Sequence, residues 1–348
     1  MCDDSSPLEY SLSIKKNSCV VRFAFEPLPL TDELRKGDRV NYFAPSQWLA
    51  DHQREHKAVD LTWFDTLSGI LLVKPDMQSS PNPAACGLTQ LGFALDLTKE
   101  PLLKIYIWPD AVARQSAPSS GAWNGCKQEH VLRAMDAIGL ATPWRKVVDY
   151  LDRLRRSSPE HAGQPEFIAW DARSPATARM KVYVRFAKAN LEQVLSHLDL
   201  GGMLDSAHTK EIKNAAAEIW DVFSSDGDPR AFQMVSGDLQ GYDERTRGVL
   251  IYYELRQGEV DPSAKFYLPV RHYFSSDLPL AERFDKFLAE KQLQKAGWYT
   301  SLLNRFCDHR PLESRAGLQA VVGCAVRDGE WEVSMYISSE AYAAERFI

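Results

Sequence analysis

The stretch Ala178–Phe186, which reads ARMKVYVRF, decides the fold because polar and apolar residues alternate along its whole length. In a β-strand, residues two apart point to the same face of the sheet. One face of this strand therefore carries only basic and tyrosine side chains, namely Arg179, Lys181, Tyr183 and Arg185. The opposite face carries only apolar side chains, namely Met180, Val182, Val184 and Phe186. We expect helices to cover the apolar face and the basic face to line an interior.

Triplets related to Lys181-Val182-Tyr183 recur along the chain. They start at Arg22, Lys104, Lys181 and Lys265, so the steps between them are 82, 77 and 84 residues (104 − 22, 181 − 104 and 265 − 181). The first triplet lacks the tyrosine, and a fifth, Ser334-Met335-Tyr336, lacks the basic residue. Recurrence at nearly constant spacing indicates that each triplet occupies the same place in a repeated unit.

Each triplet lies in the second strand of an expected hairpin. Period-two alternation predicts five strand pairs: 8–14 with 18–25, 89–97 with 102–108, 166–172 with 177–186, 247–255 with 263–270, and 317–327 with 330–338. Apolar residues at i, i+3 and i+4 predict helices over 127–139, 144–155, 189–199, 209–223 and 279–293. The segments 74–88 and 110–125 are rich in Pro, Ser, Gly and Asn, and we expect them to be surface loops.

The order of these elements indicates the architecture. Strand pairs that alternate with helix pairs favour an antiparallel sheet with helices on one side, whereas single alternating strands and helices would favour a parallel sheet. Ten antiparallel strands can close into a barrel, which removes the exposed edges. We therefore expect an α+β fold in which residues 1–348 form one barrel domain with a polar lumen surrounded by helices.

The basic and tyrosine face suggests the kind of ligand. Cations that converge on one lumen repel each other unless a polyanion lies among them, and tyrosine rings at the same level offer π faces to a cation. An allylic diphosphate satisfies both demands, because its ionisation separates a diphosphate from a carbocation. The alternative for any single strand is a solvated sheet face, but the recurrence of the pattern favours a lumen.

Composition excludes some other functions. The chain has 348 residues, 41 basic and 47 acidic, so its net charge is −6 and its pI is about 5.8. Nucleic-acid binders need a surplus of basic surface, and no apolar run approaches the ~20 residues of a membrane-spanning helix. The six cysteines are dispersed without C-x-x-C spacing, and the first residues do not read as a signal peptide. We expect a cytoplasmic protein.

Several motifs in order resemble one family. They are SPLEYSLS, VVRFAFEP, DLTWF, KIYIWP, ARMKVYVRF, KFYLPVRHY and VSMYISSEAY, which span Pro7 to about Tyr342. Together they are similar to the fungal aromatic prenyltransferases of the dimethylallyltryptophan synthase type. The resemblance implies a prenyltransferase (ABBA) barrel of ten antiparallel strands, which agrees with the hairpin count. It also implies a transferase of alkyl groups other than methyl that acts in secondary metabolism, such as indole alkaloid biosynthesis.

The resemblance assigns roles to individual residues. Glu9 matches the glutamate that accepts a hydrogen bond from the indole N–H of the acceptor. The residues that match the diphosphate-binding set are Arg22, Lys104, Arg179, Lys181, Lys265 and Arg327. The tyrosines that match those shielding the dimethylallyl cation are Tyr106, Tyr183, Tyr267 and Tyr336. Trp108 shares its face with Lys104 and Tyr106, and we expect it to line the acceptor site.

The resemblance further implies dimethylallyl diphosphate as co-substrate and no metal or other cofactor. The chain also has no aspartate-rich D-D-x-x-D element of the kind that metal-dependent prenyl transfer would need, and it lacks H-E-x-x-H, P-loop and G-x-S-x-G motifs. The expected partners are a prenyl diphosphate and a small aromatic acceptor, with no nucleic acid or membrane. A homodimer stays open, as does the alternative of a degenerate, non-catalytic barrel that binds a diphosphate or an aromatic ligand.

Departures from the family pattern bear on the acceptor. Val321 or its neighbours stand where many members have a further tyrosine, and Gln90 or Leu91 where tryptophan-using members have a basic residue. Residues 164–172 contain no arginine to hold an amino-acid carboxylate. A cyclic dipeptide, or another indole or phenolic compound, is therefore as well supported as free tryptophan. We also expect the helical lead that members carry before the segment matching Pro7 to be short or absent.

Overall fold

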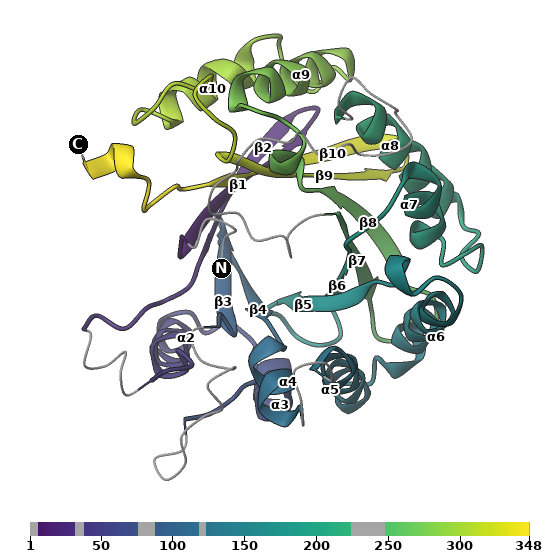
Figure 1. Ribbon diagram of the computed structural model, residues 1–348. Coiled ribbons are helices and arrows are strands. Elements are labelled where there is room, and N and C mark those ends of the chain that lie inside the picture. Colours follow the sequence, from purple (N-terminus) through teal and green to yellow (C-terminus); the bar gives the residue numbers. More distant parts are fainter. Residues whose placement is uncertain (1–5, 32–37, 76–87, 118–122, 224–247, 348) are drawn as a thin grey trace. The chain divides into compact units, whose positions relative to one another are not determined.

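The computed structural model describes residues 6–31, 38–75, 88–117, 123–223 and 248–347 (Figure 1). Its ten strands form a closed antiparallel barrel in the order β1-β10-β9-β8-β7-β6-β5-β4-β3-β2. Apart from the closure between β1 and β10, strands that follow one another in the sequence are neighbours in the sheet. This order confirms the expected barrel of five hairpins.

The strand bounds agree closely with the expected ranges. The strands are β1 (Leu8–Lys15), β2 (Ser18–Phe25), β3 (Leu91–Asp96), β4 (Leu102–Ile107), β5 (Gln164–Asp171), β6 (Met180–Phe186), β7 (Val249–Leu255), β8 (Ser263–Leu268), β9 (Gln319–Arg327) and β10 (Glu330–Ser338).

All five expected helices are present, and within the described residues there are four further helices that were not foreseen. The expected helices are α5 (Trp123–Ala137), α6 (Ala141–Ser157), α7 (Leu191–Leu198), α8 (Ala207–Phe223) and α9 (Asp277–Glu290). The additional helices are α2 (Phe43–Glu55), α3 (Thr62–Leu71), α4 (Asp110–Ser116) and α10 (Trp298–Phe306). The described part of the chain also contains three short 3-10 segments, η2 (Pro159–His161), η4 (Val270–His272) and η5 (Ala344–Phe347).

The prediction of a loop over 110–125 is wrong in part, because the first seven of these residues form α4 and the last three begin α5. The α4 segment follows Pro109, and its small apolar residues Ala111 and Ala113 are fully buried. Burial against the rest of the chain stabilises this polar, weakly periodic segment as a helix. Of the other expected loop, residues 76–87 lie outside the described part of the chain.

The chain forms two compact units. The first comprises Ala24–Arg185 with Tyr252–Ser263, and the second comprises Cys2–Phe23, Phe186–Ile251 and Ala264–Ile348. None of the described helices is both long and apolar enough to span a bilayer.

In the first unit, the outward side chains of β4, β5 and β6 form the core that period-two alternation predicts. Ile105, Trp170 and Val182 are at most 1% exposed and alternate with the polar face. Helix α5 packs against β5, and α3, α4 and α6 pack against α5 (Figure 1). Trp144 of α6 is fully buried. These contacts fix the strands whose opposite face carries the site.

In the second unit, β1, β8, β9 and β10 present a similar apolar face. Ile14, Val322, Cys324 and Met335 are fully buried there. Helix α8 packs against β9, and α9 contacts both α8 and α10 (Figure 1). On β2 the cover is incomplete, because Val21 is 36% exposed although it lies on the apolar side of its strand.

Candidate functional site

The polar face of the first unit carries a cluster of charged side chains that we call the ionic level, formed by Lys104, Asp171, Arg179 and Lys181. Lys104 of β4 lies opposite Asp171 of β5 in the strand register, and its Nζ is 3.5 Å from Asp171 Oδ1 and 2.5 Å from Asp96 Oδ2. From β6 and the residue before it, Lys181 Nζ stands 3.7 Å from Asp171 Oδ1, and Arg179 donates to Asp171 Oδ2 from Nε at 3.0 Å and from Nη2 at 2.8 Å. Three of the expected diphosphate ligands therefore converge on one carboxylate.

Asp171 was not foreseen, and its environment is unusual. The residue is 3% exposed, and no described group donates a hydrogen bond to its Oδ1. Burial by itself would raise the pKa of this carboxyl group, but Lys181, Lys104 and Arg179 together hold the pKa well below its ordinary value. Asp171 is thus a permanent anion among three cations.

Arg179 is held from a second side. Its Nη1 lies 3.7 Å from Glu254 of β7, and Arg256 donates two hydrogen bonds to the other Glu254 oxygen at 3.0 and 2.8 Å. Burial would lower the pKa of Arg179, but Asp171 and Glu254 raise it above its usual range. The guanidinium is therefore both charged and fixed in orientation.

Aromatic side chains adjoin the ionic level on the same face, starting two residues beyond Lys104 on β4 and two residues beyond Lys181 on β6, and we call them the aromatic level. Its members are Tyr106 of β4, Phe167 of β5, Tyr183 of β6, Tyr252 of β7 and Trp108, just beyond β4. Phe167 stacks on Tyr183 with ring centroids 4.1 Å apart and lies 5.3 Å from Trp108 and 6.1 Å from Tyr106. Tyr183 meets Tyr252 edge-on at 5.3 Å, and Lys181 Nζ lies 5.9 Å from the centre of the Tyr252 ring. The structure thus brings together the expected Tyr106, Tyr183 and Trp108 and adds Phe167 and Tyr252.

A further ion pair follows the aromatic level. Arg185 of β6 donates from Nη2 to Glu166 Oε1 at 2.9 Å and from Nε to Glu166 Oε2. The register of β5 against β6 shifts between Pro165 and Phe167, so Glu166 is the extra residue of a β-bulge. Bulges commonly re-aim a side chain, and here the bulge sets the Glu166 carboxylate beside Arg185.

Gln90, noted as a departure from the family pattern, has a structural role. Its side chain is fully buried, its Nε2 donates to the carbonyls of Val40 and Val73, and its Oε1 accepts from the Val73 N–H. It ties two connecting segments to the start of β3.

The second unit holds a second group of expected residues. Lys265 Nζ of β8 lies 3.8 Å from Glu332 Oε1 of β10, and Glu332 also contacts Lys15 Nζ at 3.0 Å and accepts from the Ser13 hydroxyl at 3.0 Å. Burial and the nearby Arg22 lower the pKa of Lys265, while Glu332 opposes them. Burial would raise the pKa of Glu332, but Lys265 and Lys15 lower it to about 2.

Tyrosines lie beside this group too. The rings of Tyr267 and Tyr336 have centroids 5.9 Å apart, and Lys265 Nζ is 5.4 Å from the Tyr267 ring centre. Burial raises the pKa of the Tyr336 hydroxyl, Arg22 and a hydrogen bond with Tyr267 oppose this, and Glu9 raises it further. Glu9 of β1 is half-buried and pairs with Ser338 of β10. The expected Glu9, Arg22, Lys265, Tyr267 and Tyr336 thus interact within one unit.

Arg327 is placed differently from the other expected ligands. It pairs with Glu330 at the exposed end of β9, next to the turn at Asp328 and Gly329. It lies on the same side of the strand as Val321 and Gly323, but none of the ion pairs and hydrogen bonds given above includes it.

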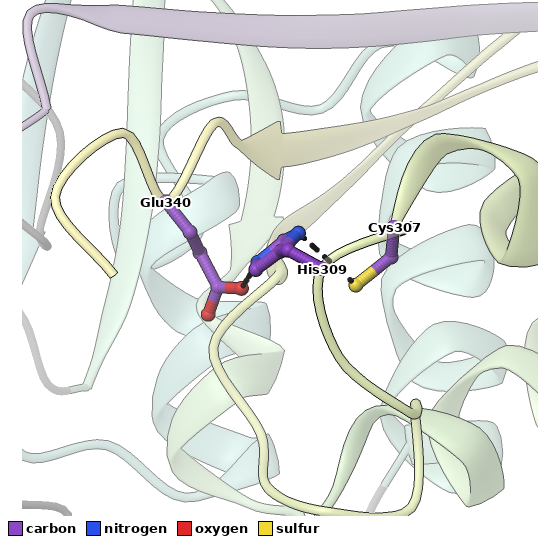
Figure 2. A group of neighbouring side chains, drawn as sticks. All are labelled: Cys307, His309 and Glu340. Atoms are coloured by element: carbon purple, nitrogen blue, oxygen red, sulfur yellow. Dashed lines mark hydrogen bonds and ion pairs between the residues drawn. The ribbon is translucent and has the colours of Figure 1, made fainter. Parts of the chain in front are cut away.

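A further cluster in the second unit consists of Cys307, His309 and Glu340, near the C-terminal end of the chain (Figure 2). His309 Nε2 is 2.8 Å from Glu340 Oε2, and its Nδ1 is 3.8 Å from the Cys307 sulfur. The two imidazole nitrogens thus face different partners. Arg310 binds both Glu340 oxygens at 2.8 and 3.0 Å and reaches Asp277 at 2.6 Å, and Arg315 also contacts Glu340. Two guanidinium groups already neutralise the carboxylate, so the cluster anchors the C-terminal segment and does not suit a metal ion.

The residues that sequence reasoning missed share one property. Asp171, Phe167, Tyr252 and Glu254 lie on strands that neighbour the triplets, and Glu332 lies on β10, two residues before the fifth triplet. Their roles follow from cross-strand register, and the signal available in the sequence was their parity, which places each on the polar side of its own strand.

Comparisons with known proteins agree with this geometry. A relative from Claviceps purpurea, 4-O-dimethylallyl-L-tyrosine synthase, is 29% identical over 347 residues, which cover 98% of this chain and 75% of the relative. The 7-dimethylallyltryptophan synthase of Aspergillus fumigatus is 25% identical over 360 residues, and the match covers 99% of this chain and 72% of that relative.

Solved structures show the same fold. AnaPT from Neosartorya fischeri superimposes with a TM-score of 0.77 at 20% identity, covering 97% of this chain and 80% of that one. The 6-dimethylallyltryptophan synthase of Micromonospora olivasterospora, solved with DMASPP and Trp, gives a TM-score of 0.70 at 19% identity. That match covers 98% of this chain and 84% of the other. These neighbours confirm the prenyltransferase barrel.

A family match then settles the resemblance noted in the sequence. Residues 1–301 match the family described as tryptophan dimethylallyltransferase, which is a family of transferases. Because this match covers most of the 348 residues, the chain belongs to the tryptophan dimethylallyltransferase family of aromatic prenyltransferases.

Proposed function

We propose that this protein moves the dimethylallyl group from dimethylallyl diphosphate to an indole-type aromatic acceptor. The observation that carries the proposal is the order of levels on the polar face of the first unit. Lys104, Arg179 and Lys181 form the ionic level, and Tyr106 and Tyr183 lie two residues beyond Lys104 on β4 and Lys181 on β6. Two residues of a strand span about 6.8 Å, which puts a diphosphate and its five-carbon chain at adjacent levels.

The cationic residues bind and stabilise the leaving group. Lys104, Arg179 and Lys181 offer charged donors to the diphosphate oxygens, and their stabilising effect grows as the C–O bond breaks and negative charge builds up. We propose that Arg22 and Lys265 of the second unit contribute in the same way. Arg327, at an exposed strand end, would act from the periphery.

The aromatic residues protect the carbocation. The π faces of Tyr106 and Tyr183 attract a cation, and rings in contact, such as those of Phe167 and Tyr183, exclude water that would trap it as an alcohol. We assign the same role to Tyr267 and Tyr336.

The acceptor then attacks the allylic carbon. Ionisation releases diphosphate with the bonding electron pair, a ring carbon forms the new C–C bond, and a base removes the ring proton to restore aromaticity. We propose that Glu9 accepts a hydrogen bond from the indole N–H and thereby raises the electron density of the ring. Relatives are named for both tyrosine and tryptophan, so the acceptors to test are tryptophan derivatives, cyclic dipeptides, indole alkaloids and phenols, with Trp108 lining their site.

We further propose that the reaction needs no metal ion, because the lysine and arginine side chains supply the positive charge that a divalent cation would otherwise bring to the diphosphate. Residues 1–348 act as one catalytic domain in the cytoplasm, where the dispersed cysteines stay reduced. Light scattering of the purified protein measures its molar mass in solution and so tests whether it forms a homodimer.

Incubation of the purified protein with dimethylallyl diphosphate and a panel of indoles and phenols, in EDTA, tests the function. We expect a prenylated product with EDTA present. Product that forms only after a metal ion is added would contradict the metal-free mechanism, and pyrophosphate binding without turnover of any acceptor would favour a non-catalytic barrel. Lys181→Ala should weaken pyrophosphate binding by at least about tenfold, and an unchanged affinity would refute the ionic level as the diphosphate site.

A further inference from the structure

Helix α2 ends in two histidines that lie one turn apart. His52 is in the last turn, and His56 caps the helix, with its N–H donating to the His52 carbonyl at 2.9 Å. The His56 carbonyl accepts from the N–H of Val59 at 3.0 Å, so the backbone of the cap is held on both sides. Residues four apart on a helix share one face, and the two imidazole rings have centroids 4.3 Å apart.

Packing holds the first of these rings in place. His52 stacks on Trp48 with centroids 4.8 Å apart and ring planes 14° from parallel. Trp48 lies 4.5 Å from Phe93 of β3, which pairs with the outward-facing Ile105 of β4 (Figure 1). The imidazole of His52 is therefore fixed against the apolar face of the strands, while His56 is exposed and can rotate toward it.

We propose that His52 and His56 together bind one divalent transition-metal ion, of the class of Cu²⁺, Ni²⁺ and Zn²⁺, at the C-terminal end of α2. Two imidazoles that ligate one ion through nitrogens about 2.1 Å away have centroids about 4.5–5 Å apart, close to the 4.3 Å found here. Imidazole nitrogen suits these metals, whereas Mg²⁺ and Ca²⁺ prefer oxygen ligands. The site is separate from the proposed prenyl transfer, which uses neither histidine.

The surrounding residues favour a bound cation. Residues 52–56 read HQREH, which has the H-x-x-E-H spacing of one class of zinc-binding helices. Burial lowers the pKa of His52, which keeps the imidazole neutral near pH 7 as a metal ligand must be, and the negative charge of Glu55 acts on the same ring. The positive charge of Arg54 is paired with Asp51 in the preceding turn.

The pair supplies two protein ligands. Within the described residues, no thiol, carboxylate or further imidazole joins the two rings as a third ligand. Water would therefore complete the coordination of an ion, and we expect binding that EDTA reverses. No hydrolytic activity is implied by the H-x-x-E-H spacing, because a catalytic zinc is held by three protein ligands.

A bound ion would clamp the last turn of α2 and with it the packing of Trp48. Because the ion needs both imidazoles on one helix face, it binds the folded chain in preference to the unfolded one and stabilises it. With Ni²⁺ at about a hundredfold excess over its Kd, the melting temperature should rise by about 2–5 °C. A melting temperature that does not rise would contradict the clamp.

Calorimetric titration of the untagged protein near neutral pH tests the site. We expect one ion bound per chain, with Cu²⁺ bound most tightly among Cu²⁺, Ni²⁺ and Zn²⁺ and no binding of Mg²⁺. His52→Ala and His56→Ala should each weaken Ni²⁺ binding by at least about tenfold, because a single imidazole loses the advantage of two linked ligands. His56 is exposed, so His56→Ala tests the site even if His52→Ala disturbs the packing on Trp48.

A matched control is His161→Ala in the same unit. It removes a single imidazole that lies 3.4 Å from the Glu160 carboxylate, and it should leave Ni²⁺ affinity unchanged. The proposal is refuted if His56→Ala binds Ni²⁺ as tightly as the unaltered protein. It is also refuted if His309→Ala, and not His56→Ala, abolishes binding, because the ion would then lie at the C-terminal cluster.

Trp48 gives a second readout of where the ion binds. Cu²⁺ or Ni²⁺ on His52 lies beside the stacked indole and should quench its fluorescence. Trp48→Phe should abolish most of this quenching while the calorimetric Ni²⁺ affinity stays within about threefold, and quenching that persists would place the ion beside another tryptophan and overturn the assignment. Prenyl transfer in EDTA should be the same in His56→Ala as in the unaltered protein, so the site and the proposed function stand or fall separately.

Discussion

Asp171 shows how one residue can set the affinity of a whole site. It places a negative charge within 3.7 Å of Lys104, Arg179 and Lys181, where a diphosphate would place its own. The carboxylate therefore holds the cations in position, but it also repels the ligand. Such repulsion favours release of pyrophosphate after the reaction.

Asp171→Asn should consequently bind pyrophosphate more tightly. The amide keeps the shape and a hydrogen bond to Arg179 but removes one negative charge, and we expect the inhibition constant of pyrophosphate to fall by at least about fivefold. Inhibition kinetics measure this, with the exposed Asp261→Asn as the matched control. An inhibition constant that rises would mean that Asp171 mainly orients the cations.

A single site residue was predictable from the sequence where the alternation of its own strand placed it on the polar face. Lys104, Lys181 and Tyr183 lie in alternating triplets, and the parity of a strand is a local property. Asp171 lies in a strand whose other residues are mostly apolar, and its importance comes from Lys104 and Arg179 on the two neighbouring strands. Register across strands depends on the whole fold, so the acidic partners could not be predicted with the bases.

At the scale of elements, the contact between β8 and β9 depends on the absence of a side chain. Gly323 of β9 pairs with Tyr267 of β8, and a Cβ at position 323 would lie 2.6 Å from Cε1 of the Tyr267 ring. One edge of the Tyr267 ring, formed by Cδ1, Cε1 and Cζ, therefore lies close against Gly323. A larger residue at 323 would force this proposed shielding tyrosine out of place.

Gly323→Ala should therefore lower the stability of the fold and let water reach the carbocation. Overpacking of this kind costs about 1–3 kcal/mol, and a displaced Tyr267 should admit water to the cation. We expect a lower melting temperature and a higher ratio of dimethylallyl alcohol to prenylated product, measured by chromatography. Gly69→Ala in α3, where a Cβ meets nothing within 4 Å, is the control, and equal behaviour of the two variants would contradict the packing argument.

Strands were easier to predict than helices. Ten strands announced themselves because a barrel wall has one apolar and one polar face, which gives a clear period of two. Helices α2 and α4 bury few large apolar side chains, with Pro45 and Leu49 in the first and Ala111 and Ala113 in the second. Their stability comes mainly from tertiary contacts, which a local pattern does not contain.

At the scale of the whole molecule, ion-paired carboxylates link stability to pH. The pKa of Glu332 is lowered from an ordinary 4.5 to about 2, and the pKa values of Asp171 and Glu340 are lowered as well. The folded state therefore binds fewer protons than the unfolded state in this range. Stability from these groups is complete above about pH 4.5 and is lost as the pH falls toward 2.

We expect the melting temperature to fall steadily on acidification below about pH 4.5, as measured by calorimetry at a series of pH values. Glu332→Gln should melt lower near neutral pH and lose less on acidification, because the group that titrates is absent. A melting temperature that is constant or rises between pH 4.5 and 2 would contradict the assigned ion pairs.

The alternation on β6 also works as a ruler for the hydrocarbon donor. A five-carbon chain that starts at Lys181 ends beside Tyr183, among aromatic rings, whereas a ten-carbon chain would continue to Arg185 and its ion pair with Glu166. Hydrocarbon gains nothing from that pair and would bury its charges. These two side chains would therefore limit the length of the prenyl chain.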